Sequence, residues 1–583
     1  MKYELQIEGM TCLACARTVE QALARAPGVE RAAVSYPTRR ASVVAGPDVA
    51  PEVMRDAVAR AGYQARLLGE ESAESIPQPV AAPAAPPADA STPSRTRSAA
   101  VARAGGRADY DLLIVGTGGA GVAAAIRASE LGATAAIVER ADAIGGTCVN
   151  VGCIPSKNLI EAAAHYHAAR TGFPGIAPCE PQLAWEQVLR QKRELVEMLR
   201  QQKYADVLAA YEGITLLRGE AGLQRPSSGS TDDALVVRVG DHEVRSRRVV
   251  LATGTRPALP PVPGLAEAGA LDSTTVMELE RLPSSLLVLG AGSIGLELGQ
   301  AFQRFGVRVI VVEAMDRILP AEDPDVSATL AQALVAEGVE LHTGTRVTRV
   351  DRTGAGVRLE IQQGSLIGHL EAEELLVATG RVPNTEALGL EAAGVRTDRR
   401  GFVEVDAFMR TSDPRIFAAG DVTGGPGYVY VAALQGGVAA QAALADIVGE
   451  EPIPADLGTV PRVTFTDPQV AAVGVTETEA RAGGLTPQVT SLPVEYLPRA
   501  AVSYRRQGTI KLVAEAGTDR LLGAHVVAPH AGDIISEAVL AVRFGLTTRD
   551  VVSTLHPYLT WGEAIKLAAQ TFTKDVAKLS CCA

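Results

Sequence analysis

Apolar residues recur along residues 1–68 with two different periods. Four segments alternate apolar and polar positions, as strands with one buried face do: residues 3–7, 29–36, 41–45 and 63–68. Two more segments repeat apolar positions at helical spacing: residues 14–26 and 52–61. The resulting βαββαβ order predicts a ferredoxin-like domain.

The pattern changes after this domain. Residues 69–108 are rich in Ala, Pro and Ser and lack the apolar residues that a core needs, so we expect a flexible linker stiffened by proline. Beyond it, apolar strands alternate with glycine-rich turns and helices. The unit LLIVGTGGAG at residues 112–121 returns as LLVLGAGSIG at residues 286–295. This repeat predicts an α/β fold with two Rossmann-like dinucleotide-binding domains.

The repeat also suggests domain boundaries. We expect the first nucleotide-binding domain over residues 109–265 and 385–455, with the second, residues 266–384, inserted into it. The remaining residues 456–583 predict a separate α+β domain. Its strand-like segments and its helical segment are residues 462–465, 509–514, 523–527 and 533–544.

The first repeat carries residues suited to bind a dinucleotide. Gly116, Gly118 and Gly121 follow an apolar strand and open a helix, and Glu139 ends the next strand. Gly116 permits the tight turn, Gly118 lets the backbone approach a pyrophosphate at the helix N-terminus, and Gly121 lets helix and strand pack closely. Glu139 can accept hydrogen bonds from a ribose diol.

The second repeat has the same pattern in Gly290, Gly292, Gly295 and Glu313. A carboxylate at this strand end suits a ribose 2′-hydroxyl and repels a 2′-phosphate, which favours NADH, although Arg317 lies nearby in the sequence. Two such sites suggest two dinucleotides, one a nicotinamide hydride donor and the other a flavin.

Composition limits the partners and the compartment. Lys+Arg 55 and Asp+Glu 67 give a net charge of −12, which argues against a nucleic-acid-binding surface. Charges at the start of the chain argue against a signal peptide, and glycines and a proline within the uncharged residues 422–445 argue against a membrane span. We therefore expect a cytoplasmic protein, in which structural disulfides are rare.

Six of the seven cysteines fall in three close pairs: Cys12/Cys15, Cys148/Cys153 and Cys581/Cys582. In a reducing compartment, such pairs indicate metal binding or redox chemistry. Cys148 and Cys153 lead into a helix and can close a small disulfide ring. The helix N-terminus and Lys157 should lower the pKa of a thiol there. Buried structural thiols and a metal knuckle are the alternatives.

Residues 145–157, together with the two nucleotide motifs, resemble the class I pyridine nucleotide-disulfide oxidoreductases, over roughly residue 110 to the C-terminus. The resemblance implies a homodimer with one FAD per subunit and a dimer interface formed by the last domain. Cys153 would be the thiolate against the flavin, and Cys148 the thiol that faces the substrate. Other residues implied in nucleotide binding are Glu139, Gly146, Thr147, Lys157, Gly254, Gly380 and Asp421.

Both ends of the chain carry thiol pairs that suit a soft metal ion. Residues 9–15, GMTCLAC, resemble the heavy-metal-associated domain, which implies that Cys12 and Cys15 bind metal. The vicinal Cys581 and Cys582, with the tail segment 562–582, resemble the mercuric reductase branch of the family.

This resemblance implies that NAD(P)H reduces Hg(II) to Hg(0) through FAD. Mercuric ion forms linear bis-thiolate complexes and moves by ligand exchange between thiol pairs. The implied metal route runs through Cys12/Cys15, then Cys581/Cys582 of one subunit, then Cys148/Cys153 of the other. Tyr558 matches a tyrosine that the family places beside the inner metal site, with a packed interface aromatic as its alternative.

Two other functions stay open from the sequence. Dithiol-reducing relatives carry a His-Pro-x-x-x-Glu acid–base pair, whereas here Glu563 stands seven residues after His556. His556 nevertheless leaves open a dihydrolipoamide dehydrogenase-like enzyme with a metal-binding appendage. The other alternative is a metal carrier whose flavoprotein part only keeps thiols reduced. Cys581 and Cys582 favour the mercury-reducing enzyme over both.

Overall fold

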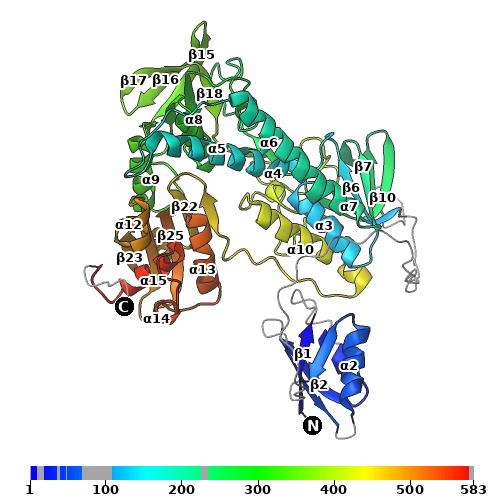
Figure 1. Ribbon diagram of the computed structural model, residues 1–583. Coiled ribbons are helices and arrows are strands. Elements are labelled where there is room, and N and C mark those ends of the chain that lie inside the picture. The colour runs from blue at the N-terminus through cyan, green and yellow to red at the C-terminus, as the bar shows by residue number, and fades with distance from the viewer. Residues whose placement is uncertain are drawn as a thin grey trace. The chain divides into compact units, whose positions relative to one another are not determined.

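The protein divides into two compact units, Met1–Val101 and Ala102–Ala583. The computed structural model describes residues 2–8, 19–20, 22–35, 40–46, 49–67, 108–224 and 234–576 (Figure 1).

The first unit is a four-stranded antiparallel sheet with the order β2-β3-β1-β4. Its elements are β1 Lys2–Glu8, β2 Val29–Ser35, β3 Arg40–Ala45, α2 Pro51–Arg60 and β4 Gln64–Leu67. Leu5 and Ile7 of β1 share a core with Met54 of α2 and with Val19 and Leu23 from helical residues before β2. These elements confirm the ferredoxin-like fold.

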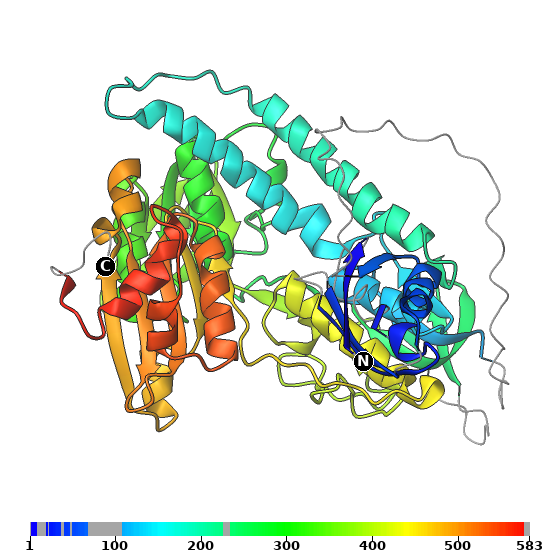
Figure 2. The same ribbon diagram turned by 60° about the horizontal axis from the view of Figure 1, so that its bottom comes forward.

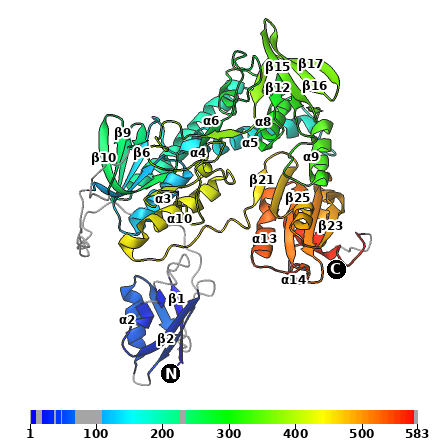
Figure 3. The ribbon, with the colours of Figure 1, turned by 180° about the vertical axis from the view of Figure 1, so that it is seen from behind.

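The first nucleotide-binding domain contains a seven-stranded sheet with the order β7-β6-β5-β10-β9-β8 and β20 beside β10. Its parallel strands are β5 Tyr110–Val115, β6 Ala135–Glu139, β7 Ile214–Arg218, β10 His242–Leu251 and β20 Ile416–Ala418, and its antiparallel strands are β8 Ala221–Leu223 and β9 Leu235–Val239. Helices α3 Gly119–Glu130 and α10 Val429–Val448 lie side by side against it (Figure 3). Leu112 and Ile114 share a core with these helices, whereas Leu113 and Val115 belong to the opposite core. The strand is therefore apolar on both faces.

Helix α10 is the one helix within the described residues that is long and apolar enough to cross a membrane. Ala439, Ala443 and Leu444 are fully buried, and they share a core with α3. This packing is that of a core helix between layers of an α/β domain.

The second nucleotide-binding domain repeats this architecture. Its parallel sheet has the order β14-β13-β12-β18, with helices α8 and α9 after β12 and β13. The bounds are β12 Ser285–Leu289, α8 Ser293–Arg304, β13 Arg308–Val312, α9 Pro324–Ala336, β14 Glu340–His342 and β18 Glu374–Val377. An antiparallel sheet of β15 Arg346–Thr353, β16 Gly356–Gln363 and β17 Leu366–Ala372 completes it. The short strands β11 Thr255–Pro257 and β19 Arg381–Pro383 pair where the chain passes between the two domains.

Two long helices connect these domains (Figure 2). Helix α4 Gly146–Val151 leads into α5 Cys153–Thr171, and α6 Trp185–Arg200 runs back along it. Trp185 of α6 packs on Phe302 and Phe305 at the end of α8. The segment that carries the thiol pair is thus held by both nucleotide-binding domains.

The C-terminal domain is a five-stranded antiparallel sheet with the order β21-β22-β25-β24-β23. Its elements are β21 Arg462–Thr464, β22 Gln469–Gly474, α11 Glu477–Ala482, β23 Pro487–Pro493, α12 Pro498–Ser503, β24 Thr509–Glu515, β25 Leu521–Ala528, α13 Ala531–Arg543, α14 Thr548–Ser553 and α15 Ala564–Gln570. Helices α13 and α15 pack on one side of the sheet (Figure 1). Val470 and Val527 share a core with Leu286 and Val288 of the second nucleotide domain. The predicted α+β domain is confirmed.

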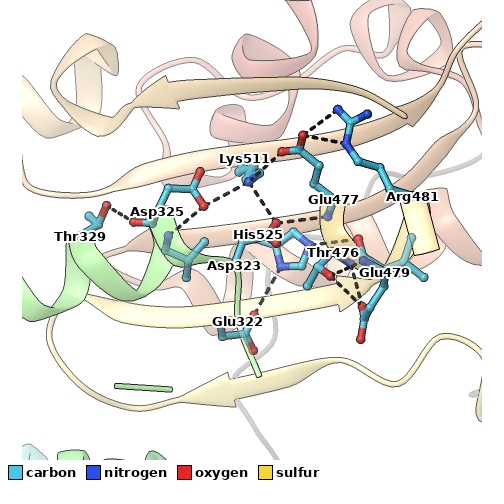
Figure 4. Close-up of polar contacts among 12 residues, drawn as sticks. Glu322, Asp323, Asp325, Thr329, Thr476, Glu477, Glu479, Arg481, Lys511 and His525 are labelled. Atoms are coloured by element: carbon cyan, nitrogen blue, oxygen red, sulfur yellow. Dashed lines mark hydrogen bonds and ion pairs between the residues drawn. The ribbon is translucent and has the colours of Figure 1, made fainter. Parts of the chain in front are cut away.

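A network of charged groups joins the start of α9 to this sheet (Figure 4). Lys511 Nζ lies 3.0 Å from Asp323 Oδ2, 3.1 Å from Asp325 Oδ1 and 3.5 Å from Glu477 Oε2. The Lys511 and Asp323 side chains are only 6% and 2% exposed. Burial alone would lower the pKa of Lys511, but its hydrogen bonds to Asp323 and Asp325 raise it, so the ammonium group stays charged.

Replacing Lys511 with methionine should lower the free energy of unfolding by about 3 kcal/mol, because the buried Asp323 would then face two further carboxylates without a cation. Thermal and urea unfolding followed by circular dichroism measures this loss. Arg481→Met is the matched control. Arg481 pairs with Glu477 but is 59% exposed, so its loss should cost less than about 1 kcal/mol. Equal losses in both variants would contradict a special role for the buried cation.

Candidate redox site

The first glycine turn joins β5 to α3 and has no room for side chains at two positions. Gly116 has a φ of +108°, and a Cβ there would lie 2.4 Å from the carbonyl oxygen of Ala252. A Cβ on Gly121 would lie 1.8 Å from the carbonyl oxygen of Gly116. The turn is therefore pressed against β10 and its own helix, and the N-terminal amides of α3 remain directed beyond the strand ends.

The second turn has the same construction. A Cβ on Gly290, which has a φ of +105°, would lie 2.6 Å from the carbonyl oxygen of Ala378, and one on Gly295 would lie 2.1 Å from that of Gly290. Gly292 has open space around it. The sequence repeat is thus a structural repeat.

The two strand-end carboxylates occupy equivalent places in the two turns. Glu139 Oε2 accepts hydrogen bonds from the amide (3.2 Å) and hydroxyl (2.5 Å) of Thr117. Glu313 accepts hydrogen bonds from the amides of Ala291 (2.8 Å) and Met315 (2.8 Å). Each carboxylate oxygen has a second lone pair, so both acids can still accept from a ribose hydroxyl.

A cavity of about 730 Å³ lies over the first turn. The residues predicted to bind the first nucleotide that line it are Gly116, Gly118, Glu139, Gly146, Thr147, Gly254 and Asp421. Cys148 and Cys153 line the same cavity, so the thiol pair opens on the space above the nucleotide turn. Lys157 and Gly380 lie outside this lining.

Asp421 is oriented by the strand pair that connects the two nucleotide domains. Thr255 Oγ1 donates a hydrogen bond to Asp421 Oδ2 at 3.0 Å. Arg381 donates in turn from Nε to Thr255 Oγ1 (2.7 Å) and from its second terminal nitrogen to the Thr255 carbonyl oxygen (2.8 Å). A cation in β19 thus fixes a carboxylate in the cavity wall through one hydroxyl.

The two thiols lie on successive helices and are free. A hydrogen bond from Cys148 lowers the pKa of Cys153 to about 7, with a further contribution from the charge of Lys157. The same hydrogen bond raises the pKa of Cys148. Cys148 is therefore the protonated donor and Cys153 the thiolate of the pair.

Lys157 is held by the other two domains of its unit. Its Nζ lies 2.6 Å from Oε2 of Glu297 in α8, which is buried. The other oxygen of Glu297 accepts a hydrogen bond from the amide of Phe465 (2.9 Å), and Nζ lies 4.5 Å from the Phe465 ring centre. These contacts fix the cation that helps to keep Cys153 ionised.

In the reduced protein, carboxymethylation of Cys153 should become faster as the pH rises through about 7, because the lowered pKa keeps the thiolate populated above that value. The reactivity is lost as the pH falls below it. In Cys148→Ala the midpoint should move upward, since the hydrogen-bond donor is lost, whereas Cys148→Ser keeps a donor and should stay near the wild-type value. Mass spectrometry of the modified peptide gives the rates. A midpoint in Cys148→Ala that matches the wild type would contradict this origin of the shift.

Sequence reasoning missed Tyr204. It lies in a π-helical turn, Gln201–Ala205, that continues α6, and its ring lies against Gly145 just before the thiol segment. Burial, followed by the charges of Cys148 and Cys153, raises the pKa of Tyr204 to about 12. Its hydroxyl is therefore a neutral polar group near the thiol pair. The surrounding sequence has no motif that could have identified it.

The remaining predicted site residues are not brought to this cavity within the described chain. Cys12, Cys15, Cys581 and Cys582 lie outside the described residues. Tyr558 is 54% exposed and lies between α14 and α15, in the C-terminal domain, away from α4 (Figures 1 and 3).

Comparisons with known proteins agree with this architecture. Residues 110–436 match the model of the pyridine nucleotide-disulphide oxidoreductases, residues 460–569 that of their dimerisation domain, and residues 4–64 that of the heavy-metal-associated domain. The chain is 40% identical to mercuric reductase of Staphylococcus aureus over 582 residues, which cover 100% of this chain and 99% of that one. It is 44% identical to mercuric reductase of Streptomyces lividans over 476 residues, covering 81% and 98%.

Solved structures show the same fold. The HOCl-induced flavoprotein disulfide reductase RclA from Escherichia coli has a TM-score of 0.70 at 29% identity, over 80% of this chain and 100% of that one. LpdA from Mycobacterium tuberculosis has a TM-score of 0.69 at 30% identity, over 79% and 99%. Family, fold class and full-length similarity agree, and the chain belongs to the pyridine nucleotide-disulphide oxidoreductase family, among the mercuric reductases.

Proposed function

We propose that this protein is a homodimeric flavoenzyme that reduces Hg(II) to elemental mercury with NAD(P)H and so detoxifies mercury, in the cytoplasm. The observation that carries the proposal is the Cys148/Cys153 pair on the wall of the cavity above the first glycine turn. Full-length similarity to proteins named mercuric reductase supports mercury as the substrate. The dimerisation-domain match supports the homodimer.

The cavity fits FAD by its walls. The glycine turn and the N-terminus of α3 suit a pyrophosphate, because the helix begins directly at the turn and its free N-terminal amides can bind an anion. Glu139 would bind a ribose, and the second turn with Glu313 would bind the nicotinamide nucleotide in the same way. FAD held there would supply the redox chemistry, a two-electron relay between NAD(P)H and the metal held by the thiols.

The chain's own residues provide the metal ligands. Cys153, the thiolate of the pair, is the first ligand available to Hg(II), and Cys148 becomes the second when it releases its proton. Two thiolates match the linear coordination and softness of this ion. The overall reaction is Hg(II) + NAD(P)H → Hg(0) + NAD(P)⁺ + H⁺, and neutral mercury leaves because it binds thiolates weakly.

Tyr204, whose pKa is raised to about 12 by burial and then by the charges of Cys148 and Cys153, stays neutral beside the thiol segment. Tyr558 of the other subunit would approach the metal ion held by the thiols, since within one chain α14 and α15, between which Tyr558 stands, lie away from α4 (Figure 1). The active site would thus be shared between subunits.

Delivery of the ion would proceed from one thiol pair to the next. Cys12 and Cys15 would capture Hg(II), and Cys581/Cys582 of one subunit would pass it to Cys148/Cys153 of the other. The heavy-metal-associated domain match supports the first step. Each transfer exchanges one thiolate for another, so the ion is never released into water.

The test is NAD(P)H oxidation driven by Hg(II) in excess thiol, with the mercury vapour trapped and quantified. The purified yellow protein should consume one NAD(P)H for each atom of mercury released. NAD(P)H oxidation without mercury vapour would refute the proposal.

Glu313 should make NADH the better electron donor. Its carboxylate is fixed by the amides of Ala291 and Met315, and Arg317 is engaged by Asp316 (3.1 Å) and by the Pro320 carbonyl (3.2 Å). We expect kcat/KM for NADH to exceed that for NADPH, and Glu313→Gln to shift the ratio about tenfold towards NADPH, because a repulsive charge is removed. Steady-state kinetics with both nucleotides measures the ratio. A strong NADPH preference of the wild type, which is the habit of the family, would overturn this expectation.

A further inference from the structure

His556 lies in the loop between α14 and α15 that also carries Tyr558. The two residues differ in burial, since the His556 side chain is 7% exposed whereas Tyr558 is 54% exposed. Leu555 on the other side of His556 is 92% exposed. The His556 side chain is thus buried in a loop where Leu555 and Tyr558 are exposed.

Both ring nitrogens of His556 are used within the fold. Nδ1 lies 2.9 Å from the carbonyl oxygen of Thr554, and Nε2 lies 2.7 Å from Oε1 of Glu537. A carbonyl oxygen can only accept, so Nδ1 carries the proton that faces it. The Glu537 carboxylate also only accepts, so Nε2 donates the hydrogen bond to its Oε1. Neither nitrogen is therefore directed at a substrate thiol.

Glu537 offers a rigid anchor. It belongs to α13, whose Ile534, Ile535 and Ala538 are buried in the core of the C-terminal domain. In the loop, Leu555 and Tyr558 are exposed, so polar contacts contribute to holding it in position.

The conformation of the loop also requires such contacts. Leu559 has a φ of +67°, a left-handed backbone that a leucine keeps only where its surroundings impose it. Glu563 accepts a hydrogen bond from the Leu559 amide at 3.4 Å, and Thr560 Oγ1 donates to the Pro557 carbonyl oxygen at 2.9 Å. Glu563 thus holds the end of the loop, and Glu537 holds its start through His556.

We infer that His556 and Glu537 form a positioning pair that holds the Tyr558 loop in place for the metal, and that His556 is not an acid–base catalyst for dithiols. This inference rests on the proposed function, in which Tyr558 approaches Hg(II) in the other subunit. The inference gives His556, which the sequence associates with dithiol chemistry, a structural role instead. The glutamate that pairs with His556 is Glu537 of α13, not Glu563.

The test combines Glu537→Ala, which removes the partner, with Glu537→Gln, whose amide can still bond to Nε2. Each is made in the full-length flavin-loaded dimer, with Tyr558 or with Tyr558→Phe. With Tyr558 present, Glu537→Ala should lower kcat/KM for Hg(II) about tenfold, whereas Glu537→Gln should keep it within about twofold of wild type. In the Tyr558→Phe background, Glu537→Ala should add less than about twofold. Hydrogen exchange of residues 554–560 should rise in Glu537→Ala only.

His556→Phe, which keeps a planar ring, serves as the second variant if Glu537→Ala loses flavin or melts early. Equal effects of Glu537→Ala in both Tyr558 backgrounds, or no effect on turnover and exchange, would overturn the positioning role while leaving the proposed function intact. Dihydrolipoamide turnover that is present in the wild type and lost in His556→Phe would overturn it in favour of acid–base catalysis. A wild type that releases no mercury would instead refute the proposed function, and exchange of the loop would still report whether the pair holds it.

Discussion

Alanine at Cys148 is expected to lower kcat for Hg(II)-dependent NAD(P)H oxidation by about 10³-fold or more. Two changes act together. The metal loses one of its two thiolate ligands in the cavity, and Cys153 loses the hydrogen bond that keeps it ionised near neutral pH. The measurement is steady-state NAD(P)H consumption with trapped mercury vapour, on protein whose flavin absorbance shows full occupancy.

Cys179→Ala is the matched control for this variant. Cys179 is also a free thiol, but it is exposed, lies in the loop between α5 and α6 and does not line the cavity. Its loss should leave turnover within about twofold of wild type. If Cys148→Ala kept more than about a tenth of wild-type turnover, Cys153 alone would suffice, and the two-thiolate inner site would be wrong.

The nucleotide turns were predictable from the sequence because their requirement is local. Only glycine fits where a Cβ would meet backbone, as at Gly121 and Gly295, and these positions have a fixed spacing after an apolar strand. The α/β layering follows for a similar reason, since apolar residues on both faces of β5 require cover on both sides. The helix after the turn begins at Gly119, so Gly121 already belongs to its first turn.

The contacts that adjust the site were not predictable in this way. Glu297 reaches Lys157 from a different domain, Tyr204 lies against Gly145 from the end of α6, and Glu537 of α13 pairs with His556. None of these residues stands in a motif, because each contact depends on how separate elements pack. The sequence indicated only that the His556–Glu563 pair was doubtful, and the structure supplies the reason, since Glu563 binds the backbone of Leu559 instead.

The properties of the Cys148/Cys153 pair suggest that binding the metal for reduction and delivering it to the site place different demands on a thiol pair. The inner pair is asymmetric, with one thiolate and one thiol, and it lies on helices that two domains hold rigidly. A rigid thiol pair in a cavity suits electron transfer. It is poorly placed, however, to exchange ligands with a metal ion that arrives bound to other thiols. We therefore expect a second thiol pair to be required wherever free thiols compete for the ion.

Replacing both Cys581 and Cys582 with alanine is accordingly expected to reduce mercury turnover by about 10²-fold or more when small thiols are in excess, because exchange into the inner pair then lacks its intermediate ligands. The tail lies outside the described residues, so this expectation follows from the sequence and from the chemistry of ligand exchange. Turnover is measured by NAD(P)H oxidation and trapped mercury, with the flavin spectrum and carboxymethylation of Cys153 as controls for an intact inner site. Without added thiol, weakly bound Hg(II) should reach the inner pair directly, and the variant should recover most of its activity. Full turnover of the variant in excess thiol would mean that the inner cysteines take mercury from small thiols unaided, and the tail would have no part in delivery.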